Sequence, residues 1–573
     1  MVRMSSSSSC ACSWTWVALL AYLFHHVHVV AEASSSSLSS SSDSEPFHHN
    51  TKNNSSGNNG SAVDADGGGG PHHQHRRRAL LATSGSQHAH VGYFLRDFSA
   101  ENPVRAPAAT GSNPPAWLAG VSHYRVLPAV FPGGMKYHFD GLATALKLTM
   151  AEDNANAVEF VSKTYASDAA KDFARCLFFG TGFGPTLGTQ ICFTNPGVNL
   201  LPIEGQMWLT IDTSSWGRVD PATLETVAGA KVDVGSLVLN AHPACDRRTN
   251  ECFVQHPCPR STSPLSDQVC FSLLIPQHDA PNANMATREL ARVSLSESEI
   301  IQHSHSPCIT ENWVVSKVDS FEIRNPLLNA NGGLLRFLNQ REGGVWLAMN
   351  RRTNATRVLR SKEKFVENHI WNCYESVDGD VLAEAVATTS SYLDTYFERS
   401  LDANIDWSLI FRPALRCVLP LSDEGDDEVS CKHMLKGGQG EDMVWDYPTF
   451  NPVYKMRDYQ WVFAIAVGDK NTSRWFDKAV KIDRHAGSVA QSWSEPGIYL
   501  TEFDFVPRGQ EVGDELDGAL LTILYNSTSD ESSFAVFCPR KMEPLALYPM
   551  KSVVPFHAHG VSCLVDGTCF TNP

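Results

Sequence analysis

The sequence predicts an all-β protein whose main body is a β-propeller. Short runs of β-branched and aromatic residues, such as QMWLTIDTS, QWVFAIAV and GALLTILYN, are separated by turns rich in Gly, Pro, Asn and Asp. Long helical periods are scarce. The body, residues 91–573, is too long for a simple sandwich and fits a propeller of about six to eight blades. No WD or kelch-like repeat fixes the blade number.

Residues 1–33 are expected to be a secretory signal peptide. An apolar run at 14–30 follows a weakly basic start at Arg3, and the small residues at 31–33 suit cleavage. An uncleaved anchor is the alternative, although three histidines within the run disfavour a full membrane span. The expected destination is the secretory pathway, with the protein secreted or kept in the ER lumen.

Residues 34–90 form a low-complexity segment of Ser, Asn, Gly and His that is expected to be disordered. Such a composition buries too little apolar surface to offset chain entropy. Because it is Ser-rich and acid-poor, it also suits a transit peptide, so a plastid reached through the ER is the alternative destination. Six sequons suit glycosylation in the ER, at Asn53, Asn54, Asn59, Asn354, Asn471 and Asn526.

The charge balance and the motifs exclude several functional classes. The chain has 46 Lys and Arg against 62 Asp and Glu, a net charge of −16, so nucleic acid is not expected to be a partner. The sequence contains no GxSxG nucleophile elbow, no HExxH zinc motif and no phosphate-binding GxxxxGK[ST] loop.

The cysteines predict disulfide bonds. Two of the 15 lie in the signal peptide, and several of the remaining 13 form close pairs around turns. Such pairs are typical of an oxidising compartment, and the absence of CxxC disfavours zinc. Because 13 is odd, at least one thiol is expected to be free or paired between chains. The predicted pairs are Cys245–Cys252, Cys258–Cys270, Cys417–Cys431 and Cys563–Cys569.

Four of the 12 histidines in the body lie at strand ends or within strands, at His242, His305, His369 and His559. Taken singly, such a residue is more often a hydrogen-bonded core histidine than a ligand. Their separations of 63, 64 and 190 residues place them on different hairpins. They can therefore meet only at a shared centre, such as the axis of a closed β array.

The segments around these histidines resemble those of the carotenoid cleavage oxygenases, a family that includes β-carotene oxygenases, plant epoxycarotenoid dioxygenases and the retinoid isomerase of the visual cycle. NAHPACD and HSPCITENWVV resemble the segments that carry the first two iron ligands, which map to His242 and His305. HIWNCYE and VPFHAHG resemble the last two, which map to His369 and His559. Because His303 and His557 lie two residues from a candidate on the same strand face, they are the alternatives that the motif register disfavours.

Four further segments resemble the family in the same order along the chain. They are YHFDGLATALKL at 137–148, LPIEGQMWLTIDTSSWGRVDPATLET at 201–226, TEFDFVPRG and DELDGALLTILYN. The resemblance implies an all-β, seven-bladed propeller with Fe(2+) on its axis and a helical or loop cap over the metal site. Imidazole suits Fe(II), and four neutral rings leave the ion its full charge.

In the family, three of the four ligand histidines bond to glutamates behind them. The matching positions here are Asp212, Asp446 and Glu502. Two of the three are therefore Asp, one methylene shorter, which must sit closer to its histidine or bridge to it through water. Such partners fix the tautomer and orientation of a ligand ring, so the change bears on metal affinity.

The resemblance implies a non-haem Fe(II) dioxygenase that splits one C=C bond of a carotenoid or apocarotenoid into two carbonyl products. The implied partners are an apolar conjugated substrate, O2, and a membrane or lipid droplet touched through an apolar patch, for which residues 173–185 are the candidate. The alternatives are a stilbene-cleaving oxygenase, a retinoid isomerase with the same iron centre, and a non-catalytic secreted binder of apolar ligands. Candidate walls for the substrate tunnel are Trp371, Tyr374, Tyr447 and Phe450.

Overall fold

The computed structural model describes residues 96–571, apart from internal gaps at 131–137, 139–140, 168–169, 171–175, 178–189, 192–194, 237, 260–267, 278–283, 296–300, 324–334, 338–343, 390–406, 408–409, 423–425, 437–442, 470–472 and 474. The predicted signal peptide, the low-complexity segment and the sequons before residue 91 lie outside these residues, as does Asn471. So do the side chains of the membrane-patch candidate.

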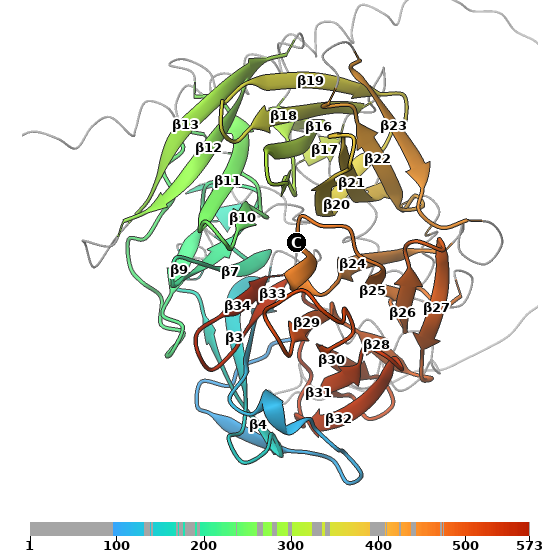
Figure 1. Cartoon of the computed structure of the whole chain (residues 1–573). Coiled ribbons are helices and arrows are strands. Elements are labelled where there is room, and N and C mark those ends of the chain that lie inside the picture. Colours follow the sequence, from blue (N-terminus) through green and yellow to red (C-terminus); the bar gives the residue numbers. More distant parts are fainter. Residues whose placement is uncertain are drawn as a thin grey trace, which may run out of the picture. The chain divides into compact units, whose positions relative to one another are not determined.

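The described chain is a β-propeller, as predicted, with sheets that follow one another around a common centre (Figure 1). The first sheet joins the two ends of the body, in the order β1-β4-β3-β2-β33-β34. Its strands are β1 (Val104–Pro107), β2 (Ser122–Val130), β3 (Leu142–Met150), β4 (Ala157–Thr164), β33 (Gly560–Cys563) and β34 (Cys569–Thr571). Because β2 pairs with β33 antiparallel, this sheet closes the ring of sheets.

The next sheets are smaller. Their strands are β7 (Asn199–Ile203), β8 (Gln206–Thr210) and β9 (Gly217–Val219) in one sheet, and β10 (Ala244–Asp246), β11 (Glu251–Pro257), β12 (Gln268–Pro276) and β13 (Met285–Ser294) in another. A separate parallel pair consists of β5 (Cys176–Leu177) and β6 (Gln190–Ile191).

A ten-stranded sheet follows, in which β19 and β23 pair in parallel and join two antiparallel groups. The first group comprises β14 (Ile301–His303), β15 (Cys308–Ile309), β16 (Trp313–Ile323), β17 (Leu335–Phe337), β18 (Gly344–Asn350) and β19 (Thr356–Ser361). The second comprises β20 (Val366–Glu375), β21 (Val381–Thr388), β22 (Leu415–Leu419) and β23 (Glu428–His433).

Two antiparallel sheets complete the circle. One contains β24 (Trp445–Thr449), β25 (Trp461–Ala466), β26 (Lys478–Asp483) and β27 (Ser488–Trp493), and the other β28 (Ile498–Leu500), β29 (Asp504–Pro507), β30 (Gly518–Asn526), β31 (Glu531–Cys538) and β32 (Glu543–Pro549). The blade number of seven stays a prediction.

The apolar core lies between neighbouring sheets rather than within one layer. In one core cluster, Leu146 of β3 and Val536 of β31 are both fully buried. A sheet that is covered on both faces needs strands that are apolar on both faces. This explains continuous apolar runs such as WVFAIA, which forms β25 and is buried at five consecutive positions.

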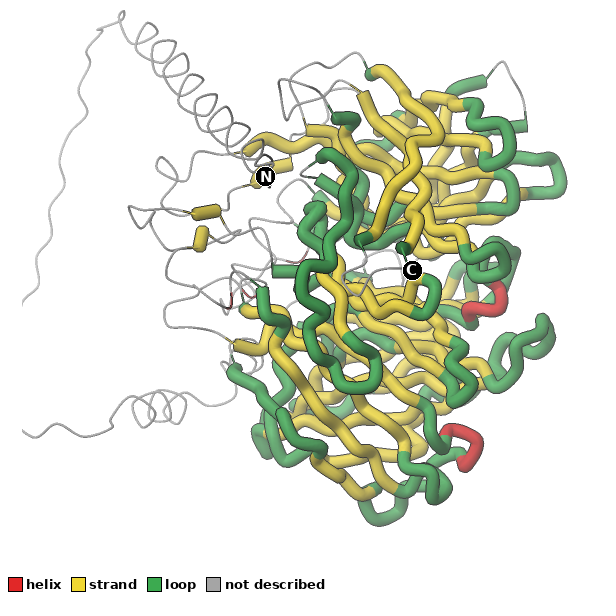
Figure 2. The backbone as a smooth tube through the Cα atoms, turned by 90° about the vertical axis from the view of Figure 1, so that its left-hand side faces the viewer, coloured by secondary structure: helices red, strands yellow, loops and turns green. Residues whose placement is uncertain are grey.

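Helices contribute little to the part of the chain that the structure describes. The bounded helical elements there are two 3-10 turns, η1 (Ala116–Leu118) and η5 (Pro452–Tyr454), and Figure 2 shows both on the same side of the body. No helix among the described residues is long and apolar enough to cross a membrane. The cap expected over the axis therefore stays a prediction.

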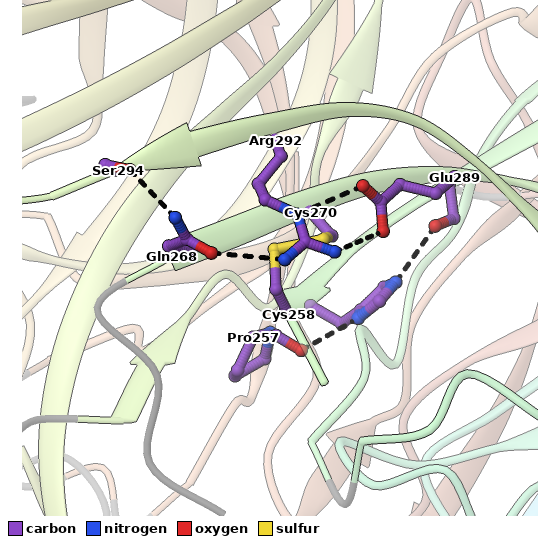
Figure 3. The surroundings of a disulfide bond; sticks show 9 residues. Pro257, Cys258, Gln268, Cys270, Glu289, Arg292 and Ser294 are labelled. Carbon is purple, nitrogen blue, oxygen red and sulfur yellow. Dashed lines mark hydrogen bonds and ion pairs between the residues drawn. A yellow bond between two sulfur atoms is a disulfide. The ribbon is translucent and has the colours of Figure 1, made fainter. Parts of the chain in front are cut away.

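All four predicted disulfides are present. Three join paired strands of one sheet, Cys245–Cys252, Cys417–Cys431 and Cys563–Cys569. Figure 3 shows the fourth, Cys258–Cys270, beside the ion pair of Arg292 and Glu289. A fifth, Cys308–Cys373, was not predicted because 65 residues separate its cysteines. Cys538 is the free thiol among the described residues.

Replacing Gly560 by alanine is expected to destabilise the closing sheet by at least about 2 kcal/mol. A Cβ at this position would overlap the carbonyl oxygen of Tyr124 and the side chain of Arg125, both on β2. Thermal and urea denaturation would measure the loss. The matched control is Gly513→Ala, where an added Cβ meets nothing within 4 Å. Equal stability of the two variants would contradict the prediction.

Candidate metal centre

Four histidine side chains from four separate segments meet at the centre of the ring. His242 lies just before β10, His305 between β14 and β15, His369 within β20, and His559 just before β33. One ligand nitrogen from each lies within 4.8 Å of the others. Three of the residues are buried, and the His305 side chain is 18% exposed. The structure therefore brings together the four histidines that the motif register selected.

The two alternative histidines lie apart from this cluster or outside the described side chains. The His557 ring is buried and its Nδ1 lies 2.9 Å from the carbonyl oxygen of Pro555. His303 pairs with Asp319 in the β14–β16 ladder, and its side chain is not among those described.

The ring nitrogens in this cluster fit a cation. Nε2 of His242 is buried without a hydrogen-bond partner. Nε2 of His369 lies 3.1 Å from Nε2 of His559, so two basic nitrogens face each other at hydrogen-bond distance. Two acceptors that face each other without a donor cost free energy, and a metal ion would satisfy the lone pairs of His369 and His559 at once. The donor set therefore suits a transition metal.

The pKa values of the rings favour the form that binds metal. Burial, and then the neighbouring histidines, hold the pKa of His242 and His559 well below 6.5, so both rings are neutral. Burial is the largest single influence on His305 and lowers its pKa, but Asp212, together with smaller contributions from Glu367 and Asp446, outweighs burial and the net pKa is raised. His305 is therefore the ligand whose protonation competes with a metal on acidification.

Each of the three carboxylates predicted to lie behind the ligands contacts its histidine. Asp212, just after β8, places its oxygens 2.8 and 3.0 Å from Nδ1 of His305. In β24, Asp446 lies 2.9 Å from Nδ1 of His369. Glu502, just before β29, lies 3.1 Å from Nδ1 of His559. The two shorter side chains thus reach their rings directly, without the water bridge considered above.

The fourth ring has a neutral partner that sequence reasoning missed. The side-chain amide nitrogen of Asn199, at the start of β7, lies 3.2 Å from Nδ1 of His242. A second asparagine, Asn368, donates to Asp446 over 2.6 Å and holds that carboxylate. Neither asparagine carries a sequence signal, since only the packing of neighbouring sheets brings Asn199 to His242 and Asn368 to Asp446.

Arg125 connects the metal centre to the closing sheet and was also missed. Its fully buried guanidinium donates to Oε2 of Glu502 over 2.7 Å and to the carbonyl oxygen of Ala558 over 2.8 Å. It also donates to Asp504 over 3.2 Å. Glu502 contacts the ring of His559, and Ala558 directly precedes His559 in the chain. Arg125 therefore fixes this ligand through both its ring and its backbone.

Glu367 is a further buried acid at the centre. Its Oε2 accepts from the backbone N–H of His305 over 3.1 Å, and burial raises its pKa to about 8. It lies two residues before His369 on β20. This strand therefore carries the candidate ligand His369 and also the carboxyl group that anchors the backbone of His305. Sequence reasoning overlooked it because a single Glu inside a strand has no distinctive pattern.

A pocket adjoins the cluster at His242. His242, Trp371, the Cys308–Cys373 disulfide and Lys455 contribute to its lining. Burial lowers the pKa of the Lys455 amine to about 8. Trp371 is thus one candidate wall aromatic that lies beside the centre.

The other three candidate aromatics divide into one near the site and two away from it. The centroid of the Tyr447 ring lies 5.5 Å from those of both His369 and His559. Phe450 instead packs on Tyr459, with centroids 4.5 Å apart. The Tyr374 hydroxyl accepts from Arg484 over 2.9 Å in a buried network between sheets.

Replacing any one of the four histidines by alanine is expected to reduce bound metal to well below one ion per chain. Loss of one ring removes a quarter of the ligand set. Metal analysis of purified protein and Co(II) titration would measure this. The control is His256→Gln, since His256 is buried but bonds only to Pro257 and Ser272 in the hydrogen bonds found for it. Full retention of metal in His242→Ala would contradict the assignment.

Metal affinity is expected to fall on acidification by about tenfold per pH unit, once the pH drops below the raised pKa of His305. Below that pKa the ring is protonated, and binding must displace the proton. Co(II) titrations at several pH values would locate the onset of this loss. Asp212→Asn removes the interaction that raises the pKa, so its onset should move to lower pH. An onset at the same pH in both proteins would contradict the expectation.

Comparison with known proteins agrees with this geometry. The sequence matches the retinal pigment epithelial membrane protein (RPE65) family over residues 97–561. No match was found among curated proteins.

Several solved structures have a fold similar to that of this chain. A mutant of Synechocystis apocarotenoid oxygenase superposes with a TM-score of 0.67 at 16% identity, covering 84% of this chain and 99% of its own. The cobalt-substituted form of that oxygenase superposes with a TM-score of 0.65 at 16% identity, covering 84% of this chain and 99% of its own. A chimera of the oxygenase and RPE65 superposes with a TM-score of 0.64 at 16% identity, covering 83% of this chain and 98% of its own. At this identity the likeness concerns the fold.

Proposed function

The chain belongs to the retinal pigment epithelial membrane protein family, and on that basis we propose that it is a non-haem Fe(II) dioxygenase of carotenoids or apocarotenoids. The reaction adds O2 across one C=C bond of the substrate. That bond breaks, and each of its carbons takes one oxygen atom, so the two products are carbonyl compounds.

The observation that supports this proposal is the meeting of four imidazoles, two of them held neutral by burial. The candidate ligand group contains no carboxylate. Such a set would leave a bound ion its charge of 2+. Fe(II) held there would supply the redox chemistry by which O2 reacts with an alkene. The cobalt-substituted form of the oxygenase with a similar fold supports a transition-metal ion at this place.

The chain's own residues orient the ligands and exclude water. Asp212, Asp446 and Glu502 each hold a ring at Nδ1, which leaves Nε2 free to face the centre. The Tyr447 ring lies against two of the ligands, and its residue is 2% exposed. An aromatic wall here would hold a flat polyene beside the metal and keep bulk water away.

The family also gives reason to consider a second activity, because its name refers to the retinal pigment epithelium. Retinoid isomerisation with ester cleavage would use the same four histidines but would not insert O2. A stilbene-cleaving oxygenase or a non-catalytic binder of apolar ligands would also retain the fold. These activities differ in their products, so chemistry rather than geometry separates them.

The test is incubation of Fe(II)-loaded protein with a panel of carotenoids, apocarotenoids, stilbenes and retinyl esters under 18O-labelled O2. Products would be reduced at once to alcohols, which stops oxygen exchange with water, and then analysed by mass spectrometry. We expect two fragments from a carotenoid or apocarotenoid, each with one 18O atom.

The control is His559→Ala, which should release no fragment. An isomerised retinol without 18O would favour the isomerase, and labelled fragments from stilbenes alone would favour the stilbene-cleaving enzyme. Loaded protein that is inert towards the whole panel would leave the ligand-binding function.

We further propose that the protein acts in the secretory pathway, in contact with a membrane or lipid droplet that supplies its apolar substrate. Five disulfides among the described residues support an oxidising compartment. The apolar run at 14–30 would direct the chain there.

A further inference from the structure

One disulfide among the five in the described residues differs from the others in what it joins. Four of them link cysteines 6 to 14 residues apart, on or beside neighbouring strands of one sheet. Cys308–Cys373 spans 65 residues and joins β15 to β20. These strands do not pair with each other, because β15 pairs with β16 and β20 pairs with β21. The bond is therefore a cross-link between strands that backbone pairing leaves independent.

Each of the linked cysteines lies a few residues after a candidate ligand, His305 in the segment before β15 and His369 on β20. His305 lies three residues before Cys308, and His369 lies four residues before Cys373. At about 3.3 Å per residue, each ring is within about 15 Å of the sulfur on its own segment of the chain. Cys308 and Cys373 are 6% and 1% exposed, and they line the same pocket as His242.

Residues 304–307 lie in neither β14 nor β15, so the other contacts found for the His305 segment are individual hydrogen bonds, to Asp212, Asn240, His242 and β20. Strand β15 contributes only Cys308 and Ile309 to pairing with β16, so no ladder holds the residues just before it. The backbone N–H groups of His305 and Ser306 donate to Glu367 on β20, over 3.1 and 3.4 Å. The hydroxyl of Ser306 also donates to the carbonyl oxygen of Asn368, over 3.4 Å. The disulfide thus adds a covalent tie to these hydrogen bonds between the His305 segment and the strand that carries His369.

We propose that Cys308–Cys373 is a positioning cross-link of the metal centre, which fixes the spacing between the segment of His305 and the strand of His369. The inference rests on the proposed function, because it assumes that the four histidines hold a metal. Metal ligands bind tightly when they are held in place before the ion arrives, and a loose ligand pays for its ordering on binding. Opening the disulfide therefore weakens metal binding.

The test compares two variants of the full chain, each lacking one disulfide. The first is Cys308→Ala with Cys373→Ala. The matched control is Cys417→Ala with Cys431→Ala, which removes a bond between β22 and β23, in the same ten-stranded sheet and the same core cluster. Neither of these control strands carries one of the four histidines.

Metal-free protein would be titrated with Co(II), whose ligand-field absorption reports both affinity and coordination geometry. We expect Cys308→Ala/Cys373→Ala to bind Co(II) at least about tenfold more weakly, with an altered spectrum. The control should bind within about twofold of wild type, even where its melting temperature falls. Thermal denaturation of all three proteins separates loss of stability from loss of affinity.

Two results would overturn the inference alone: unchanged affinity in the Cys308/Cys373 variant, or an equal loss in both variants. Wild-type protein that binds no Co(II) would overturn the metal centre and the inference together. Should the variant not fold, wild-type protein would be separated into metal-bound and metal-free fractions and mapped by peptide mass spectrometry. The disulfide is then expected in the bound fraction, and free Cys308 and Cys373 thiols there would overturn the proposal.

Discussion

The convergence of four imidazoles around one small space is the constraint on which the rest of the structure depends. Nε2 of His242 has no partner, and Nε2 atoms of His369 and His559 lie 3.1 Å apart. Electron pairs held this close stabilise a cation and destabilise the protein without one. The surrounding fold must therefore resist the separation of these rings, and its closed circle of sheets provides that resistance.

Ring closure and ligand placement are joined through one arginine. Arg125 lies on β2, which pairs with β33 from the opposite end of the body. Its guanidinium holds Glu502, and Glu502 in turn holds His559. A change in the closing sheet would thus reach the metal centre through two hydrogen bonds. The cost of burying this charge is met by carboxylates on two sides, Glu502 and Asp504.

The four histidines differ in the charge of the side chain that contacts their Nδ1 atom. Three rings have a carboxylate at Nδ1, whereas His242 has the amide of Asn199. His305 and Asp212 are also the most exposed pair, with side chains 18% and 34% exposed. Acidification therefore protonates His305 before His242 and His559, whose pKa values burial holds well below 6.5.

The sequence by itself determined the β architecture, the four histidines and the short-range disulfides. Turn spacing, strand-like runs and motif register are local properties, so they are legible in a linear chain. It also placed Asp212, Asp446 and Glu502 by their motifs. Whether the two shorter acids contact their histidines directly or through water was left open.

Only the tertiary structure decided which residues support those ligands. Asn199, Arg125 and Glu367 lie on strands whose own patterns are ordinary, and their role arises from packing between sheets. The same holds for Cys308–Cys373, whose partners are 65 residues apart. Contacts between distant strands follow from how the ring closes in space, which local sequence does not encode.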